Sequence, residues 1–265
     1  MTNASTATTT SPSASIVWEA GSTTLGQWEN SSSYQCGSPT ASGASISFKL
    51  SQGAAPGGGY CGRNQAQPHN SSGGLSQLTS GQTYIWTFTY VDGTVSDGAP
   101  GMGQDCHTNA KCGEGVTTGC PGTACPGDAR STIWQIHGDG ETNSPCTTLG
   151  FANGSNGVSS PQVWAFYDCK TGSTPVLEWT GTYTPQETDT WKITVNISDS
   201  KTGSVLLYRN GTLVYSRTGI STFTDSPSGN PWWNFGPYKW LWESRPNDSA
   251  MSAINMTIKN MLVEK

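Results

Sequence analysis

Short segments in which apolar and polar residues alternate dominate the hydrophobic pattern of this chain. The clearest covers residues 82–91, where an aromatic residue recurs at every second position from Tyr84 to Tyr90. Successive side chains of a β-strand point to opposite faces, so this segment predicts a strand with one buried face. Asp92-Gly93 then supplies a turn that ends it.

Similar segments recur along the whole chain, separated by Gly, Asn, Asp and Ser, and amphipathic helical patterns are hard to find. The other predicted strands are 16–19, 45–50, 60–67, 131–137, 162–167, 176–183, 190–198, 203–209, 212–216, 232–242 and 253–263. Asn210-Gly211 joins two of them and is typical of a tight hairpin. This pattern predicts an all-β sandwich or jelly roll of two packed antiparallel sheets.

The length of 265 residues suits one large all-β domain. Residues 1–15 form a Ser/Thr-rich stretch, which we interpret as a linker or mature N-terminal tail, and the domain covers residues 16–265. Within it, residues from about 97 to 128 form a long insertion that is rich in cysteine, glycine and proline. Long loops in compact domains are often functional, for example as one wall of a cleft.

Charge and cysteine content narrow the class of protein. The net charge of −5 argues against a nucleic-acid-binding surface, and no apolar run is long enough to cross a membrane. Zinc sites need tighter ligand pairs than the eight cysteines offer, so disulfides and an oxidising compartment are favoured. The cysteines are Cys36, Cys61, Cys106, Cys112, Cys120, Cys125, Cys146 and Cys169. With several Asn-x-Ser/Thr sequons, they predict a secreted, extracellular glycoprotein.

Candidate chemistry lies first on the predicted strand 131–137. Alternation places Trp134 and Ile136 on one face and Gln135 and His137 on the other. An amide and an imidazole on the polar face of a sheet can bind a ligand and transfer protons. Taken alone, such a histidine is more often a structural residue held by hydrogen bonds.

Two further polar strands support the chemical interpretation. In the predicted strand 60–67, Arg63, Gln65 and Gln67 share one face. In the predicted strand 232–242, the residues expected on one face are Asn234, Gly236, Tyr238 and Trp240. We expect Gly236 to leave room there for a ligand to approach the backbone.

The three segments together resemble the β-jelly-roll polysaccharide lyases, the group that includes heparin lyase I, alginate lyases and glucuronan lyase. Gln135-Ile136-His137 matches the Gln-Ile-His motif of this family, and Arg63-Asn64-Gln65 matches its Arg-x-Glu motif. The segment 234–238 matches its Lys-x-Gly-x-Tyr motif, and the resemblance runs from about residue 45 to the end. Gln65 replaces the usual acid and Asn234 the usual lysine, so both departures remove a charge.

The resemblance implies a concanavalin A-like jelly roll whose concave sheet carries the substrate cleft, and β-elimination at a uronic acid. Arg63 and Gln135 would neutralise the uronate carboxylate, with Asn64, Gln65 and Asn234 as further substrate contacts. Tyr238 would serve as acid and also as base, with His137 as the base for one C5 epimer or as a helper. Lys239 would lower the pKa of Tyr238, although alternation places it on the opposite face unless the strand bulges. Trp232, Trp240 and Tyr208 would be platforms for sugar rings, unless these aromatic residues belong to the core.

We therefore expect a secreted monomeric lyase acting on an acidic polysaccharide such as glucuronan or alginate, with 4,5-unsaturated products. No cofactor is required, and a structural calcium ion rests on the resemblance alone. One alternative is a jelly roll that binds carbohydrate without turnover. Another is a glycoside hydrolase, which needs two facing carboxylates, and the candidates for these are Glu141, Glu178 and Glu243.

Overall fold

The computed structural model contains β-strands and no helix in the parts of the chain that it describes. These parts are residues 14–30, 36–51, 61–69, 77–93, 131–138, 145–153, 162–169, 175–184, 186–224, 230–238 and 253–265. Strands β1 to β8 are Ile16–Glu19, Trp28–Asn30, Thr40–Ser42, Ser45–Ser51, Ala66–Pro68, Thr83–Asp92, Ser131–His137 and Thr147–Asn153. Strands β9 to β15 are Gln162–Asp168, Val176–Thr182, Thr188–Asn196, Gly203–Arg209, Thr212–Ile220, Trp232–Tyr238 and Ala253–Glu264.

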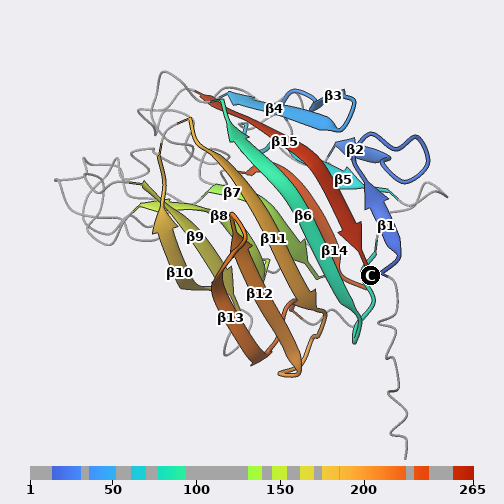
Figure 1. Cartoon of the computed structure of the whole chain (residues 1–265), viewed down its shortest axis with the longest axis vertical. Helices are drawn as coiled ribbons and strands as arrows, with labels where there is room; N and C mark the ends of the chain where they lie inside the picture. Colours follow the sequence, from blue (N-terminus) through green and yellow to red (C-terminus); the bar gives the residue numbers. More distant parts are fainter. Residues whose placement is uncertain are drawn as a thin grey trace, which may run out of the picture.

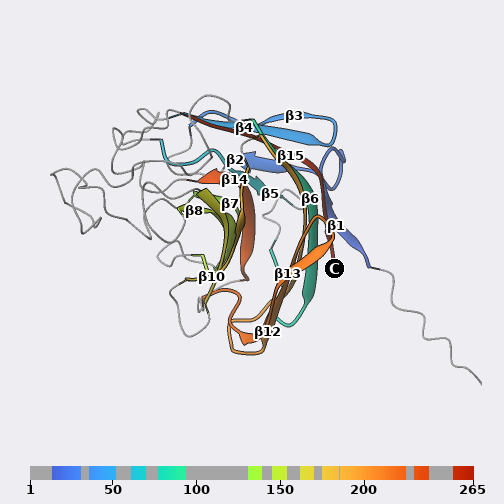
Figure 2. The same ribbon diagram turned by 60° about the vertical axis from the view of Figure 1, so that its left-hand side comes forward.

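The strands form two antiparallel sheets that pack face to face (Figures 1 and 2). One sheet has seven strands in the order β10-β9-β8-β7-β14-β5-β2. The other has eight, in the order β13-β12-β11-β6-β15-β4-β3, with β1 also paired to β15. The predicted all-β class with two packed sheets is therefore confirmed.

Large aromatic side chains from both sheets fill the space between them. Trp86 of β6 contacts Trp134 of β7 at a ring-centroid distance of 5.1 Å, and Trp164 of β9 contacts Trp191 of β11 at 4.7 Å. All four indoles are buried. Burying rings of this size makes the largest apolar contribution to folding, and it fixes which face of each strand points inward.

Most strands follow the alternation predicted from the sequence, and the differences have physical reasons. Strand β8 was not predicted, because Gly150 interrupts its apolar pattern. A side chain at Gly150 would lie 1.9 Å from the backbone oxygen of Ser131, so the glycine allows β7 and β8 to approach closely. The predicted strand 60–67 is shorter than expected, because Arg63 takes part only in an isolated bridge to Tyr238 before β5 begins.

Two disulfides lie in the described part of the chain, Cys36–Cys61 and Cys146–Cys169. The prediction of disulfides is confirmed for these four cysteines. The other four, Cys106, Cys112, Cys120 and Cys125, lie outside the described residues. The Cys36–Cys61 bond lies next to Arg63, since the backbone N–H of Cys36 donates to the carbonyl oxygen of Arg63 over 2.9 Å.

Removing the Cys36–Cys61 disulfide should weaken both the fold and the position of Arg63. The bond closes a loop of 25 residues, so a Cys36→Ser/Cys61→Ser variant should lose about 3 kcal/mol of stability through unfolded-chain entropy. Cys146→Ser/Cys169→Ser opens a loop of similar length and serves as the matched control. Chemical denaturation should show similar losses for both variants, whereas only the first should weaken the binding of an acidic oligosaccharide. Equal binding losses would contradict a specific role for the first disulfide.

Candidate active site

The three polar segments predicted to act together lie on neighbouring strands of the seven-stranded sheet. Strand β14 pairs with β7 on one side and with β5 on the other. Trp134 of β7 and Phe235 of β14 point inward, where they contact Trp86 and Phe48 of the other sheet. Their neighbours Gln135 and Asn234, which are paired across the two strands, therefore lie on the opposite side, called the outer face below.

Irregular pairing brings further side chains onto the same face. Strand β14 has one extra residue between Phe235 and Tyr238 relative to β7, so Tyr238 pairs with Thr132. Strand β7 has an extra residue relative to β8 between Thr132 and Trp134. Thr132 and Gln135 are three positions apart, yet they hydrogen-bond to each other, so both lie on the outer face.

Gly236 sits in the irregular part of β14 with φ of +111°. A side chain at this position would lie 2.6 Å from the Asn64 carbonyl oxygen and 2.6 Å from the ring of Phe48. The glycine is needed for its backbone conformation and for close packing against the neighbouring chain. The prediction that Gly236 opens space for a ligand on the outer face is therefore wrong.

A row of buried amide side chains runs across the three strands. Asn234 donates from Nδ2 to Oε1 of Gln65 over 3.2 Å, and Gln65 donates from Nε2 to the carbonyl oxygen of Gly236 over 3.2 Å. Gln65, Asn234 and Gln135 are fully buried. The two residues that depart from the family motifs, Gln65 and Asn234, are therefore direct partners.

Gln135 holds His137 in a defined state. Thr132 donates to Oε1 of Gln135 over 3.3 Å, which leaves the amide nitrogen of Gln135 3.0 Å from Nε2 of His137. An amide nitrogen only donates, so Nε2 accepts and the proton of the neutral imidazole lies on Nδ1. Nδ1 is buried and has no hydrogen-bond partner among the described residues. This N–H is therefore a buried donor that no described residue satisfies.

The imidazole of His137 stays neutral. Burial lowers its pKa from 6.5 to about 3, and the positive charge of Arg63 acts in the same direction. Trp232 stacks on the ring at a centroid distance of 4.6 Å and an interplanar angle of 11°. His137 therefore enters the site as a neutral group with a fixed orientation, and it is not a cation that could balance a carboxylate.

Arg63 and Tyr238 lie beside the row of buried amides and are more exposed than it. They pair in an isolated bridge, and the guanidinium carbon of Arg63 lies 4.2 Å from the centroid of the Tyr238 ring. Both side chains are partly exposed, whereas the amides beside them are buried. The outer face thus combines a cation, a phenol and a neutral imidazole, which belong to three partly exposed residues.

The arrangement of strands is similar to that of a solved polysaccharide lyase. The structure of an endo-β-1,4-glucuronan lyase from the fungus Trichoderma reesei aligns with a TM-score of 0.53, covering 94% of this chain and 91% of that chain at 10% identity. The chain shares the fold of that lyase. The resemblance predicted from the motifs is therefore confirmed at the level of the fold.

Alginate lyases also align with this chain. That of Zobellia galactanivorans aligns with a TM-score of 0.48 at 16% identity, over 89% of this chain and 82% of that chain. That of Pseudomonas aeruginosa aligns with a TM-score of 0.49 at 14% identity, over 87% of this chain and 86% of that chain. No protein-family model and no curated protein sequence match this chain.

Two predicted substrate contacts lie elsewhere. Asn64 precedes Gln65 and points away from the outer face, where its Nδ2 donates to the carbonyl oxygen of Lys49 over 2.8 Å. Tyr208 belongs to β12 of the eight-stranded sheet and pairs there with Lys192. The structure therefore does not bring these two side chains to the face that carries Tyr238. Alternation accounts for Asn64, and sheet membership, which short patterns do not encode, accounts for Tyr208.

The remaining predicted site residues either lie outside the described residues or have other partners. Lys239, Trp240, Glu141 and Glu243 lie outside the described residues. Glu178, a candidate for the hydrolase alternative, is in an ion pair with Arg217 at 2.9 Å on the β10 and β13 side of the molecule. Thr132 was missed because strict alternation places it with the core, and only the irregularity in β7 turns it outward.

Among the described residues, no group of three or more His, Cys, Asp or Glu side chains is arranged to hold a metal ion. The described part of the chain contains no helix that is long and apolar enough to span a membrane.

Proposed function

We propose that this protein is a polysaccharide lyase that cleaves a uronic-acid polymer by β-elimination. The observation that carries the proposal is the outer-face arrangement of Arg63, Tyr238 and His137, on a fold shared with a glucuronan lyase. It combines a carboxylate-binding cation with groups that hold or move protons, and this combination is what the reaction needs.

The reaction breaks one carbon–oxygen bond without water. A base removes the proton from C5 of the uronic acid, the electron pair forms the C4–C5 double bond, and the bond from C4 to the glycosidic oxygen breaks. That oxygen takes up a proton, so the products are a shortened chain and a 4,5-unsaturated uronide. The C5 proton is weakly acidic, so the neighbouring carboxylate must be neutralised as negative charge moves onto it.

Arg63 is the group suited to the carboxylate, because its planar guanidinium donates two parallel hydrogen bonds to the two oxygens. The Nδ1–H of His137 adds a neutral donor on the same face. Gln135 has the role of fixing the imidazole in this tautomer, and Thr132 that of fixing Gln135. This assigns His137 as a donor in place of the base, and Gln135 as its support.

Tyr238 is the group suited to proton transfer at C5 and at the leaving oxygen. Its ring lies against the Arg63 guanidinium, whose charge stabilises a transient phenolate. As the phenolate, Tyr238 can do both steps, since the proton that it takes from C5 makes it a phenol, which then gives this proton to the leaving oxygen. Trp232, partly exposed and stacked on His137, offers a flat apolar surface for the neighbouring sugar ring.

The exact polymer, secretion and glycosylation belong to the same proposal. Glucuronan and alginate are the first candidates, because the chain shares its fold with the glucuronan lyase and its motifs resemble those of both groups. The disulfides Cys36–Cys61 and Cys146–Cys169 favour an oxidising, extracellular location.

A panel of polyuronates followed by ultraviolet absorbance tests the proposal. Glucuronan, alginate blocks of either epimer and heteropolymeric uronans should be incubated with the protein. At least one should yield the absorbance of a conjugated unsaturated uronide, together with shorter chains. Binding of a polymer without any absorbance would instead assign a non-catalytic carbohydrate-binding jelly roll, and new reducing ends without absorbance would assign a hydrolase.

A further inference from the structure

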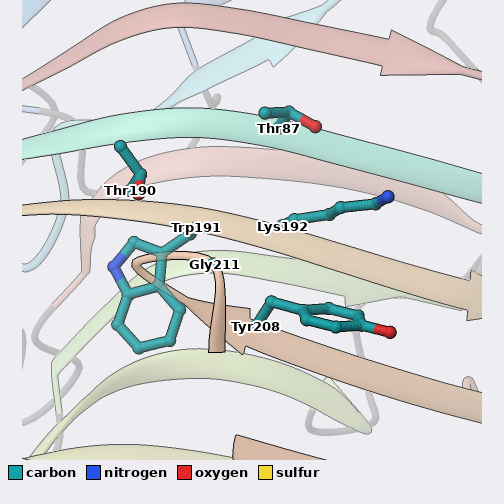
Figure 3. A pocket seen from close by; sticks show the side chains of 6 residues that line it. All are labelled: Thr87, Thr190, Trp191, Lys192, Tyr208 and Gly211. Carbon is teal, nitrogen blue, oxygen red and sulfur yellow. The ribbon is translucent and has the colours of Figure 1, made fainter. Parts of the chain in front are cut away.

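A second surface with features of a sugar-binding site lies on the other side of the molecule. The face of the eight-stranded sheet that points away from the core has an open depression of about 310 Å³ (Figure 3). It is lined by Thr87, Thr190, Trp191, Lys192, Tyr208 and Gly211. None of these residues belongs to the active-site face of the seven-stranded sheet.

Strand register aligns the central side chains of this depression. Lys192 of β11 pairs with Tyr208 of β12 on one side and with Thr87 of β6 on the other. The three side chains therefore form a row across three adjacent strands. Lys192 and Tyr208 extend side by side in the same direction, and the lysine nitrogen lies 5.8 Å from the centroid of the tyrosine ring (Figure 3).

One end of the depression is closed by the β12–β13 hairpin. Asn210 and Gly211 both have positive φ and form its turn. Oδ1 of Asn210 accepts hydrogen bonds from the backbone N–H of Thr190 over 2.8 Å and from its hydroxyl over 3.2 Å. These bonds hold the turn against β11, so the floor of the depression is built from fixed strands.

The chemistry of the row fits an anionic sugar. Lys192 is exposed and has no ion-pair partner in the described part of the chain, although the whole chain carries a net charge of −5. Tyr208 is only partly exposed, so it presents an apolar ring that is held in place. A sugar packs its C–H face on such a ring, a carboxylate pairs with the ammonium group, and threonine hydroxyls bond to sugar hydroxyls.

We propose that this depression is a second binding site for an acidic polysaccharide, which it holds by stacking one uronate residue on Tyr208 beside Lys192. The identity of the polymer rests on the function proposed above. We assign binding alone, without bond cleavage, to this site. The second site would keep the protein bound to its polymer. Two sites on one protein raise the apparent affinity for long or cross-linked chains without any new contact at the active site.

The two sites face opposite directions, which decides what kind of chain can use both. Packed sheets lie about 10 Å apart, and the side chains on both outer faces add to this separation. A short oligosaccharide therefore occupies one site at a time, whereas a long chain can pass around the edge of the sandwich and a polymer network can contact both faces. The second site should thus matter for polymers and gels.

Affinity electrophoresis through gels containing the polyuronate tests the site separately from catalysis. In a Tyr238→Phe background, which prevents degradation of the gel, Tyr208→Ala and Lys192→Gln should each weaken retention about three- to tenfold. Added salt should reduce the difference made by Lys192→Gln, because that contact is ionic. The charge-matched control is Lys201→Gln, an exposed lysine in the turn before the other end of β12, and it should leave retention unchanged.

Three results would overturn the proposed second binding site. They are unchanged retention in both variants, an equal loss of retention in the Lys201→Gln control, and no retention of the parent protein in any polyuronate gel. Sedimentation of the parent and of the Tyr208→Ala variant tests whether this face binds a second copy of the chain instead of a sugar. A parent protein that is dimeric, together with a Tyr208→Ala variant that is monomeric, would assign the face to a dimer interface. The proposed reaction is judged separately, by the absorbance assay on the wild-type protein.

Discussion

Replacing Tyr238 by phenylalanine should lower the elimination rate by about 10²- to 10⁴-fold while leaving polymer binding nearly unchanged. The change removes only the hydroxyl, which is the proposed carrier of the proton from C5 to the leaving oxygen, and general acid–base groups typically contribute a factor of this size. The ring that lies 4.2 Å from the Arg63 guanidinium remains, so the carboxylate-binding cation should keep its place.

The measurement is the initial rate of ultraviolet absorbance on the best substrate of the panel, together with the affinity of the same variant for that polymer. Tyr215→Phe is a matched control, because it removes a phenolic hydroxyl that bonds to Asp168 and comes from the eight-stranded sheet. It should lower thermal stability and leave the elimination rate unchanged. Full activity of Tyr238→Phe would show that the proton passes through another group.

How far the sequence predicts this structure depends on the range of the interactions involved. Alternation places Tyr84 and Trp86 inward and separates Trp134 from Gln135, because one face of each strand must be buried. These are local effects with a period of two residues, and the sequence displays them directly. The same local rule also gave the correct face for Asn234.

The errors arise where distant segments decide the geometry. The face of Thr132 depends on one extra residue in β7 relative to β8, and the environment of Gly236 depends on Phe48 in the other sheet. Tyr208 and Tyr238 are both tyrosines near polar neighbours, yet the pairing order of the strands places them on opposite sides of the sandwich. Pairing order is a property of the whole fold, so no short motif contains it.

Contact between Gln65 and Asn234 changes the meaning of the two departures from the family motifs. Considered one at a time, each departure puts a neutral residue where the motif that the sequence resembles has a charged one. The hydrogen bond between them over 3.2 Å makes them one coupled pair, in which two neutral amides occupy the positions where the motifs have an acid and a lysine. The net charge of the pair is the same in both cases, so the field at Arg63 and Tyr238 is altered less than either departure alone suggests.

Restoring one of these charges alone should therefore be strongly destabilising, and restoring both should be tolerated better. Gln65→Glu and Asn234→Lys each place a lone charge at a fully buried position, which should lower the free energy of unfolding by about 3–5 kcal/mol. Gln65→Glu also replaces the donor to the Gly236 carbonyl oxygen by an acceptor. The double variant forms an ion pair in place of the amide pair, and it should recover about 1–3 kcal/mol relative to the sum of the single changes.

A double-mutant cycle of chemical denaturation measures this coupling. The control is Gln82→Glu, the same chemical change at an exposed position, which should alter stability by about 0.5 kcal/mol or less. Strictly additive losses in the double variant would contradict a coupled pair. If the coupling is found, the absorbance assay on the double variant decides whether the neutral pair selects the substrate. We expect the double variant to retain elimination and to prefer the polyuronates in a different order. The reason is that the charges near Arg63 and Tyr238 return, whereas those two residues are unchanged.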